Sequence, residues 1–344
     1  MEDRQNVLII RFSAMGDVAM TAPVVKQIAQ QNPNAQFIYL TRPFFKPFFS
    51  DIPNLTFHPF NPKDYKGLNG LYHLYRELKE LNITAVADLH FNLRSRIISL
   101  FFKTAGIKVA HLNKGRTEKK ALTRKNNKIL QPLTPMWFRY ASVFKALGFQ
   151  FSIKNELLAE NKKPIDPEVQ QLTGTKATDY WVGISPFAQH LQKIYPLNKL
   201  EEVIKALNEA NIRIFIFGGG EDEKSIAEKW QEKYENCCSV VGKITLEQEL
   251  NLINQLDVMI SMDSAGMHLA SLTSTKVVSI WGATHPFAGF LGFGQSNDNC
   301  IQSEIYCRPC SVYGNKPCFR GDLACMQMIE PQQIINKTLH LLNS

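Results

Sequence analysis

The chain has 344 residues and a formal net charge of +8 at pH 7. This length exceeds what one hydrophobic core usually organises, and the aliphatic and aromatic content is that of a globular protein, so we expect two folded domains. The first six residues are polar and no apolar run approaches the roughly 20 residues that cross a bilayer, which argues against a signal peptide or membrane span and favours a cytoplasmic protein.

Apolar strand candidates alternate with helical patterns in the first half of the chain. Such alternation predicts a parallel, doubly wound α/β sheet, and we assign residues 1–160 to a first Rossmann-like domain. Strands are expected at residues 7–11, 36–40 and 85–88, and helices at residues 18–31, 68–81 and 93–103.

Residues 161–179 are polar and contain two prolines, which predicts a linker. The alternation then restarts and predicts a second Rossmann-like domain over residues 180–330. A final apolar pattern at helical spacing predicts a C-terminal helix within residues 331–344. In the second domain, strands are expected at residues 181–185, 212–217, 239–241, 257–261 and 277–281, and helices at residues 197–209, 222–234, 246–255 and 265–272.

Much of the positive charge lies in residues 111–128, which contain seven Lys or Arg and one Glu. The field of this segment should attract phosphates, anionic lipids or nucleic acid. The alternative is a solvated surface loop, and composition alone does not decide between lipid and nucleic acid.

The first chemically informative motif follows the first expected strand. An apolar run ends in a small-residue turn, and Asp17 stands where the next helix should begin. In an open α/β sheet this point lies at the carboxyl edge of the strands, where ligands bind. Asp17 is therefore placed to do chemistry, although an Asp at this position can also simply cap the helix.

This stretch resembles the N-terminal motif of glycosyltransferase family 9, the ADP-heptose:lipopolysaccharide heptosyltransferases. In that family a strand, a Ser/Thr-x-x-Gly-Asp turn and a Thr-x-Pro helix start follow in this order. The resemblance implies that Asp17 is the catalytic base and that Ser13 and Gly16 belong to the acceptor side.

A second strand, turn and helix pattern spans residues 257–272. Small residues after Asp263 let the backbone approach a ligand, and the start of the expected helix presents free N–H groups, so we predict a diphosphate site. The pattern resembles the family's nucleotide-binding motif. For His268, the alternative is a helix histidine whose hydrogen bonds are satisfied within the protein. The resemblance implies contacts to a nucleotide sugar from Asp263, Ser264, Ala265, Gly266 and His268.

Three further loops of the second domain resemble the family. The first of these segments contains Ser185, which we expect to contact the nucleotide sugar. It also has a lysine, Lys193, three residues before a proline, which implies a stabiliser of the leaving diphosphate. This segment departs from the family where Phe187 replaces a usual glycine and where Ile-Tyr replaces the commoner Arg-Trp before the proline. The resemblance also implies that Thr284 and Glu221 contact the donor. For Thr284, the alternative is an ordinary turn after a strand. The two acidic residues that follow Glu221 could instead cap the helix.

Arg94 and Arg96 follow the third strand of the first domain and open a helix. The resemblance implies that they hold a carboxylate or phosphate of an acidic acceptor, a task that guanidinium groups perform bidentately. A solvated helix face is the alternative.

Five of the seven cysteines lie after position 299. Four of them could supply a tetrahedral zinc site, although only the first pair has the tight spacing of a zinc ribbon. The alternative is a set of free thiols, because disulfides are disfavoured in the cytoplasm. A similar tail occurs in the branch of the family that resembles heptosyltransferase II. The four candidate ligands of a structural zinc are Cys307, Cys310, Cys318 and Cys325.

The resemblance covers nearly the whole chain and implies the GT-B architecture, in which two Rossmann-like domains face each other across a cleft. It implies an inverting transferase that moves heptose from an ADP-sugar donor to the inner core of lipopolysaccharide, an anionic glycolipid, at the inner face of the cytoplasmic membrane. No Asp-x-Asp motif of the kind that anchors a metal–diphosphate complex is present, so we expect no required metal cofactor. We also expect no nucleic-acid partner.

Two other functions remain open on the sequence. A GT-B transferase or epimerase that uses another nucleotide sugar would keep the loop at residues 264–266 but need not depend on Asp17. A zinc-containing nucleic-acid-binding protein would instead depend on the four cysteines and on the basic segment.

Overall fold

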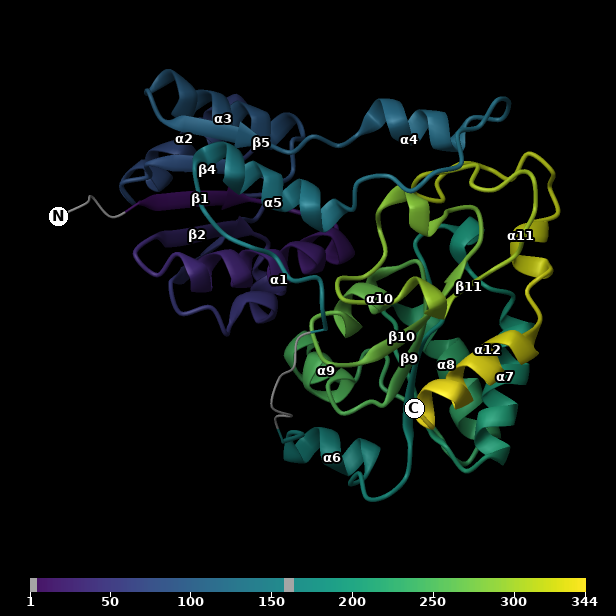
Figure 1. Cartoon of the computed structure of the whole chain (residues 1–344). Coiled ribbons are helices and arrows are strands. Elements are labelled where there is room, and N and C mark those ends of the chain that lie inside the picture. Colours follow the sequence, from purple (N-terminus) through teal and green to yellow (C-terminus); the bar gives the residue numbers. More distant parts are fainter. Residues whose placement is uncertain (1–4, 158–163) are drawn as a thin grey trace. The chain divides into compact units, whose positions relative to one another are not determined.

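The computed structural model describes residues 5–157 and 164–344, and the chain divides into two compact units (Figure 1). The first unit comprises Met1–Lys114 and Met136–Asn155, and the second comprises Gly115–Pro135 and Glu156–Ser344. The predicted domain start at residue 1 and the predicted start of the linker at residue 161 lie outside the described residues.

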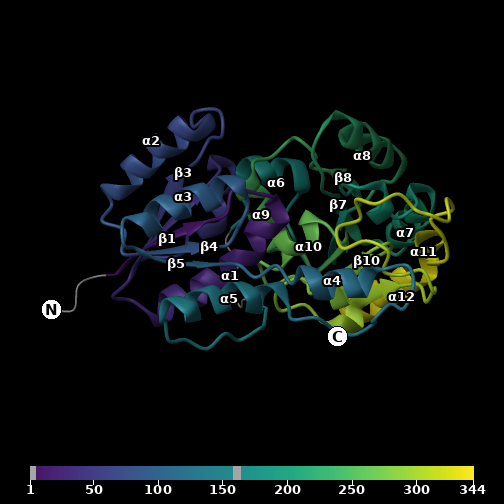
Figure 2. The same ribbon diagram turned by 90° about the horizontal axis from the view of Figure 1, so that it is seen from above.

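The first unit is built on a sheet of parallel strands in the order β3-β2-β1-β4-β5. Helices α2 and α3 cover one face of this sheet and α1 and α5 the other (Figure 2). The strands are β1 (Asn6–Ile10), β2 (Gln36–Thr41), β3 (Leu55–Pro59), β4 (Ala85–Asp88) and β5 (Lys108–His111), and the helices are α1 (Met15–Gln31), α2 (Gly67–Lys79), α3 (Leu93–Thr104) and α5 (Met136–Leu147), with a 3₁₀ helix η1 (Pro43–Phe49).

Burial explains why residues 7–10 of β1 are all apolar. Helices cover both faces of the sheet, so a central strand has no solvent side. Leu8 and Ile10 enter the core beneath α2 and α3, and Val7 and Ile9 are equally buried on the opposite face.

The second unit repeats this architecture with parallel strands in the order β11-β10-β9-β6-β7-β8. Its strands are β6 (Trp181–Ser185), β7 (Arg213–Ile216), β8 (Cys237–Ser239), β9 (Val258–Met262), β10 (Lys276–Trp281) and β11 (Cys300–Gln302). Its helices are α4 (Arg116–Thr123), α6 (Pro167–Thr173), α7 (Leu197–Glu209), α8 (Glu221–Lys233), α9 (Leu246–Ile253), α10 (Ala265–Ala270), α11 (Ala324–Gln327) and α12 (Pro331–Leu342), with 3₁₀ helices η2 (Leu191–Lys193), η3 (Pro286–Ala288) and η4 (Asn297–Asn299).

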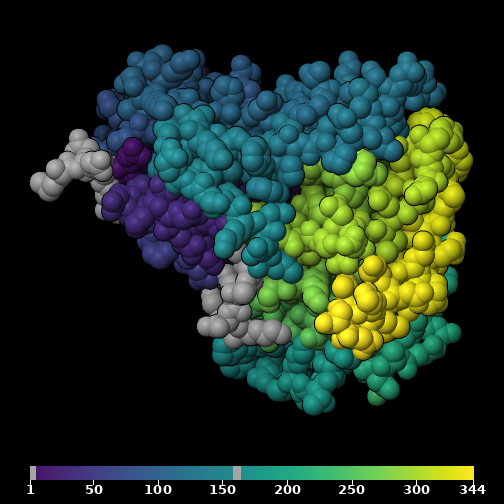
Figure 3. Space-filling view, viewed as in Figure 1, coloured from purple at the N-terminus to yellow at the C-terminus, as the bar shows by residue number. Residues whose placement is uncertain are grey.

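Helices α7, α8 and α12 lie on one face of this sheet and α9 and α10 on the other (Figure 1). The predicted C-terminal helix is confirmed as α12. It packs on α7 and against β9 and β10, and its outer side, yellow in Figure 3, forms part of the surface of the second unit.

The predicted α/β class with two doubly wound sheets is confirmed, and each expected strand and helix has a counterpart. Several elements were not expected, among them the edge strands β3, β5 and β11. The expected strand at residues 239–241 lies two residues earlier, as β8, and the stretch predicted to be a linker contains α6, which buries Val169.

The largest difference concerns residues 115–135, which lie in the first predicted domain but pack within the second unit (Figure 1). The Lys119 Nζ lies 4.3 Å from the centroid of the Phe290 ring. The Lys128 Nζ donates to the Cys307 carbonyl at 2.8 Å, and the Leu133 N–H donates to the Phe287 carbonyl at 2.8 Å. A fully solvated loop is therefore the wrong interpretation of this basic segment.

Among the described residues, we find no helix with both the length and the apolar character that a bilayer span requires.

Candidate functional site

Each sheet has one position where the strand order reverses, and ligands of open α/β sheets bind at such positions, beyond the carboxyl ends of the strands. In the first unit the reversal lies between β1 and β4, and in the second between β6 and β9. The residues that follow these strands in each unit therefore form the candidate site.

In the first unit, Asp17 is the third residue of α1 and its carboxylate pairs with the Arg11 guanidinium, Oδ2 to Nη2, at 2.8 Å. The N-cap residue of α1 is Ala14, which makes no side-chain cap hydrogen bond. Asp17 keeps 32% of its side chain exposed, whereas Arg11 keeps 7%. The Asp17 carboxylate is therefore partly exposed to solvent, and the buried Arg11 guanidinium holds it in position.

Arg11 is a residue of the site that sequence analysis missed. Its Nη1 donates to the Leu89 carbonyl at 2.7 Å and its Nε to the Ser13 carbonyl at 2.9 Å. Burial is the largest single influence and acts to lower the pKa of Arg11, but the charge and hydrogen bond of Asp17, together with Tyr140 and Tyr39, outweigh it and hold the pKa above its ordinary value. An arginine directly after an apolar run is the sequence signal that could have revealed it.

Ser13 lies between β1 and α1 and contributes its carbonyl to Arg11, whereas Gly16 is already the second residue of α1, because the helix begins three residues earlier than expected. Their assignment to the acceptor side stays a prediction.

His90 follows β4 and lies across the strand reversal from this turn. Its Nδ1 accepts a hydrogen bond from the Phe12 N–H at 3.1 Å. Burial, together with the charges of Arg11 and Lys114, lowers the pKa of His90 to about 3. His90 is therefore a neutral hydrogen-bond acceptor at physiological pH.

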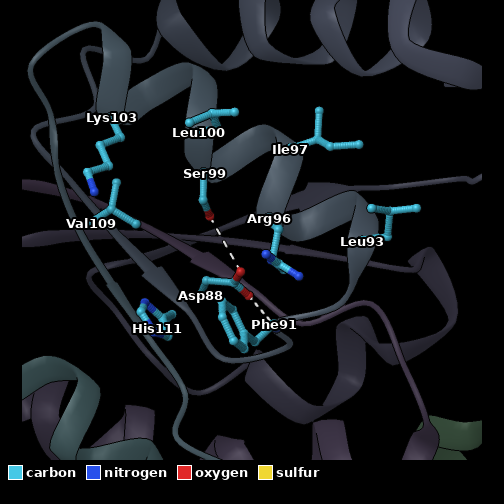
Figure 4. Close-up of a pocket in the computed structure, with 10 residues that line it drawn as sticks. All are labelled: Asp88, Phe91, Leu93, Arg96, Ile97, Ser99, Leu100, Lys103, Val109 and His111. Carbon is cyan, nitrogen blue, oxygen red and sulfur yellow. Dashed lines mark hydrogen bonds between the residues drawn. The ribbon is translucent and has the colours of Figure 1, made fainter.

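A pocket of about 350 Å³ lies beside the carboxyl ends of β4 and β5 (Figure 4). Its deepest polar group, Asp88, is fully buried and accepts hydrogen bonds from the His90 and Phe91 N–H groups and from the Ser95 Oγ. The other lining residues are Phe91, Leu93, Arg96, Ile97, Ser99, Leu100, Lys103, Val109 and His111.

Aromatic stacking shapes the mouth of this pocket. The Phe91 and His111 rings stack with centroids 4.2 Å apart, and the Arg96 guanidinium lies 5.2 Å from the Phe91 centroid (Figure 4). Of the two arginines predicted for the acceptor, the structure brings Arg96 to the pocket, whereas Arg94 is exposed and does not line it.

In the second unit, Lys193 and Asp263 form an ion pair, Nζ to Oδ2, at 3.0 Å. Both side chains are largely buried, at 16% and 6% exposed. Sequence analysis singled out these residues separately, and the structure brings them together. An incoming phosphate would share the Lys193 ammonium with Asp263.

Two hydroxyl groups near this pair lack internal partners. The Oγ atoms of Ser264 and Thr284 are buried, and neither has a hydrogen-bond partner within the described part of the chain. They follow β9 and β10, which are neighbouring strands. Because a buried hydroxyl without a partner costs free energy, this arrangement suits a bound ligand that accepts hydrogen bonds.

Gly266 lies at a close packing contact. A Cβ atom added to it would lie 2.4 Å from the Ser185 Cβ, so the glycine lets α10 pack against the end of β6. Its contact to a ligand stays a prediction. Helix α10 extends only from Ala265 to Ala270, which makes it too short to supply a strong helix dipole.

The remaining predicted donor residues lie in the same unit. His268 is buried in α10. Glu221 is the first residue of α8 and is exposed. Glu223 accepts a hydrogen bond from the Gly219 N–H at 2.7 Å, ahead of the N-cap residue Gly220. The donor-contact assignments of His268 and Glu221 stay predictions.

The structural zinc predicted at the four C-terminal cysteines stays a prediction. All seven thiols are free, and the described ranges contain no group of three or more His, Cys, Asp or Glu side chains arranged to hold a metal ion. Cys237 and Cys238 are buried in the edge strand β8, as expected for packing residues.

Two parallel sheets of Rossmann type, with the candidate residues at their strand reversals, define a GT-B glycosyltransferase. The model for glycosyltransferase family 9 (heptosyltransferase) matches residues 71–317, most of the chain. The chain therefore belongs to glycosyltransferase family 9.

Individual relatives agree with this assignment. The lipopolysaccharide core heptosyltransferase OpsX of Haemophilus influenzae is 26% identical over 296 residues, which cover 83% of this chain and 81% of that protein. A family 9 glycosyltransferase structure from Veillonella parvula superposes with a TM-score of 0.75 at 17% identity, covering 100% of this chain and 99% of the other. The E. coli ADP-heptose LPS heptosyltransferase II superposes with a TM-score of 0.69 at 17% identity, covering 98% of each chain.

The neutral state of His90 leads to a pH dependence of stability. Its pKa is about 3 in the folded protein and near 6.5 when unfolded, so the unfolded chain binds more protons between these values. The free energy of unfolding of the first unit should therefore fall as the pH drops below about 6.5, by up to about 1.4 kcal/mol per pH unit from this group.

Hydrogen exchange of the β1 and β4 amides at pH 7.5, 6.5 and 5.0 measures this loss, with His90→Gln as the comparison. We expect the wild type to lose about 2 kcal/mol more than the variant between pH 6.5 and 5.0. Parallel pH curves for the two proteins would show that His90 does not carry the effect.

Proposed function

We propose that this protein transfers heptose from ADP-L-glycero-D-manno-heptose to the inner core of lipopolysaccharide, with inversion at the anomeric carbon. Family membership and the names of the relatives support the donor and acceptor classes. The observation that carries the proposal is the set of polar groups beside the carboxyl ends of β6, β9 and β10, which suits a diphosphate. That set contains the Lys193–Asp263 pair and the unpartnered hydroxyls of Ser264 and Thr284.

In the proposed reaction Asp17 accepts the proton of the acceptor hydroxyl. The acceptor oxygen then bonds to the anomeric carbon as the bond from that carbon to the diphosphate oxygen breaks. Arg11 holds the Asp17 carboxylate in place throughout, and the Lys193 ammonium stabilises charge on the departing ADP. The proposal assigns no step to a metal ion.

The pocket of the first unit supports an acidic, lipid-linked acceptor. Among the described residues, no carboxylate pairs with Arg96 or Lys103, so both charges are available to an acceptor phosphate or carboxylate. Leu93 and Leu100 are 73% and 55% exposed beside them. Apolar and basic side chains together suit a peripheral position on an anionic membrane surface.

Calorimetric titration with ADP-heptose, ADP-glucose, UDP-glucose and GDP-mannose tests the donor. We expect selective binding of ADP-heptose, weakened about 10- to 100-fold in Ser264→Ala because a hydrogen bond to a charged group is lost. Ser239→Ala is the matched control, since its Oγ is also buried without a partner but lies at the far edge of the sheet. Preference for another nucleotide sugar would overturn the proposed donor.

Asp17→Ala tests the base. We expect turnover to fall about 10²- to 10⁴-fold, the usual contribution of a general base, while ADP-heptose affinity stays within twofold of the wild type, roughly the scatter of remote substitutions. Asp64→Asn, an exposed carboxylate of the same unit, serves as the control. Near-normal turnover would remove Asp17 from the mechanism, and NMR of the wild-type product reports whether the anomeric configuration is inverted.

Arg96→Met and Arg94→Met form a matched pair for the acceptor. Only the first of these arginines lines the pocket. We expect Arg96→Met to raise the KM for acceptor about three- to tenfold, as expected for one partly exposed charged contact, and Arg94→Met to leave it nearly unchanged. Equal effects of the two substitutions would mean that the pocket does not receive the acceptor.

A further inference from the structure

The cysteine-rich segment, residues 300–325, contains five cysteines. Arg308 lies in this segment between Cys307 and Pro309 and is a buried cation, 7% exposed. Its Nε donates to the Gly282 carbonyl at 2.6 Å, and its Nη2 donates to the Thr284 carbonyl at 3.0 Å. Its other contacts are to the Ser303 carbonyl at 2.7 Å and the Gln302 Oε1 at 2.9 Å. All four acceptors are neutral, and no described carboxylate forms an ion pair with this guanidinium.

The same segment also binds the carbonyl of Ala283, which lies between Gly282 and Thr284. The Ala283 carbonyl accepts hydrogen bonds from the Cys310 N–H at 3.0 Å and the Ser311 N–H at 3.2 Å. Three consecutive carbonyls, those of residues 282–284, are therefore held by residues 308–311. This loop directly follows β10.

The loop is also tied to the segment that carries the lysine. The Ala283 N–H donates to the Gln192 carbonyl at 3.3 Å, and a Cβ on Gly282 would lie 2.9 Å from the same oxygen. Gly314, further along the cysteine-rich segment, lies against the Lys193 side chain, because a Cβ there would approach the Lys193 Cγ to 2.5 Å. The cysteine-rich segment thus supports both Thr284 and Lys193 from outside.

A buried cation without a carboxylate costs several kcal/mol in general, and apolar side chains could pack this segment without that cost. Burial lowers the pKa of Arg308 to about 10, which leaves it charged at neutral pH. Its guanidinium fork reaches the carbonyls on both sides of Ala283, a geometry that a single ammonium does not reproduce.

We propose that Arg308 is a positioning residue for the donor: it clamps the 282–284 loop so that the Thr284 hydroxyl, buried and without an internal partner, meets the phosphates or sugar of the nucleotide sugar. This inference rests on the proposed function. It also gives the cysteine-rich segment a purpose that requires no metal.

The test is a double-mutant cycle with Arg308→Lys and Thr284→Val, read by calorimetric binding of ADP-heptose and of ADP. We expect each single substitution to weaken ADP-heptose binding about tenfold and the double variant to be no weaker than the weaker single variant, because Arg308 acts through Thr284. Arg320→Lys is the control, since that arginine lies in the same segment but pairs with Asp322 at the surface. Additive losses, or unchanged affinity in Arg308→Lys, would overturn the inference.

Hydrogen exchange of the amides at residues 283–285 provides a readout without ligand. We expect Arg308→Lys to speed their exchange about tenfold while Arg320→Lys leaves it unchanged. If the wild-type protein binds neither nucleotide, the proposed function fails, and the exchange rates still decide the clamp: unchanged rates would refute it.

Discussion

Parallel pairing of every strand is the constraint on which the rest of the structure depends. Because the strands of each sheet run in the same direction, their carboxyl ends lie at one edge of that sheet. The loops that carry the candidate site residues therefore meet at this edge. Asp17 follows β1, and Asp263 and Thr284 follow β9 and β10. Residues separated by long stretches of sequence thus become neighbours within each unit without any special device.

The two units fix their functional loops with buried arginines, in different ways. Arg11 pairs with a carboxylate that remains partly exposed, so the cation holds a group that can do chemistry. Arg308 binds only neutral oxygens and so holds backbone. In both cases the buried charge fixes the loop by direct ion-pair or hydrogen-bond contacts.

Sequence reasoning recovered what depends on local pattern. Buried central strands such as β1 and β6 were predicted because their apolar runs follow from covering both faces of the sheet. Edge strands such as β5, with an exposed lysine and histidine, were missed because burial imposes no such pattern on them. The family assignment rested on motifs and is confirmed, whereas the role of each site residue stays a prediction.

Tertiary contacts were beyond the reach of sequence pattern. The tight packing of Gly266 on Ser185 joins residues 81 positions apart by number, and nothing local distinguishes a glycine needed for packing from one needed for a ligand. The clamp around Arg308 likewise depends on carbonyls from another loop. For the basic segment at residues 111–128, sequence pattern left a solvated surface loop open, although Lys119 is buried.

The placement of residues 115–135 has a consequence for how the protein can form. The chain leaves the first unit after Lys114, returns at Met136 and leaves again after Asn155, so neither unit is a continuous stretch. During synthesis the ribosome releases α4 well before the residues that it contacts, such as Phe290, have been made. The two units therefore cannot complete their folding strictly one after the other. A protein that began at the predicted linker would lack residues 115–135, which belong to the second unit.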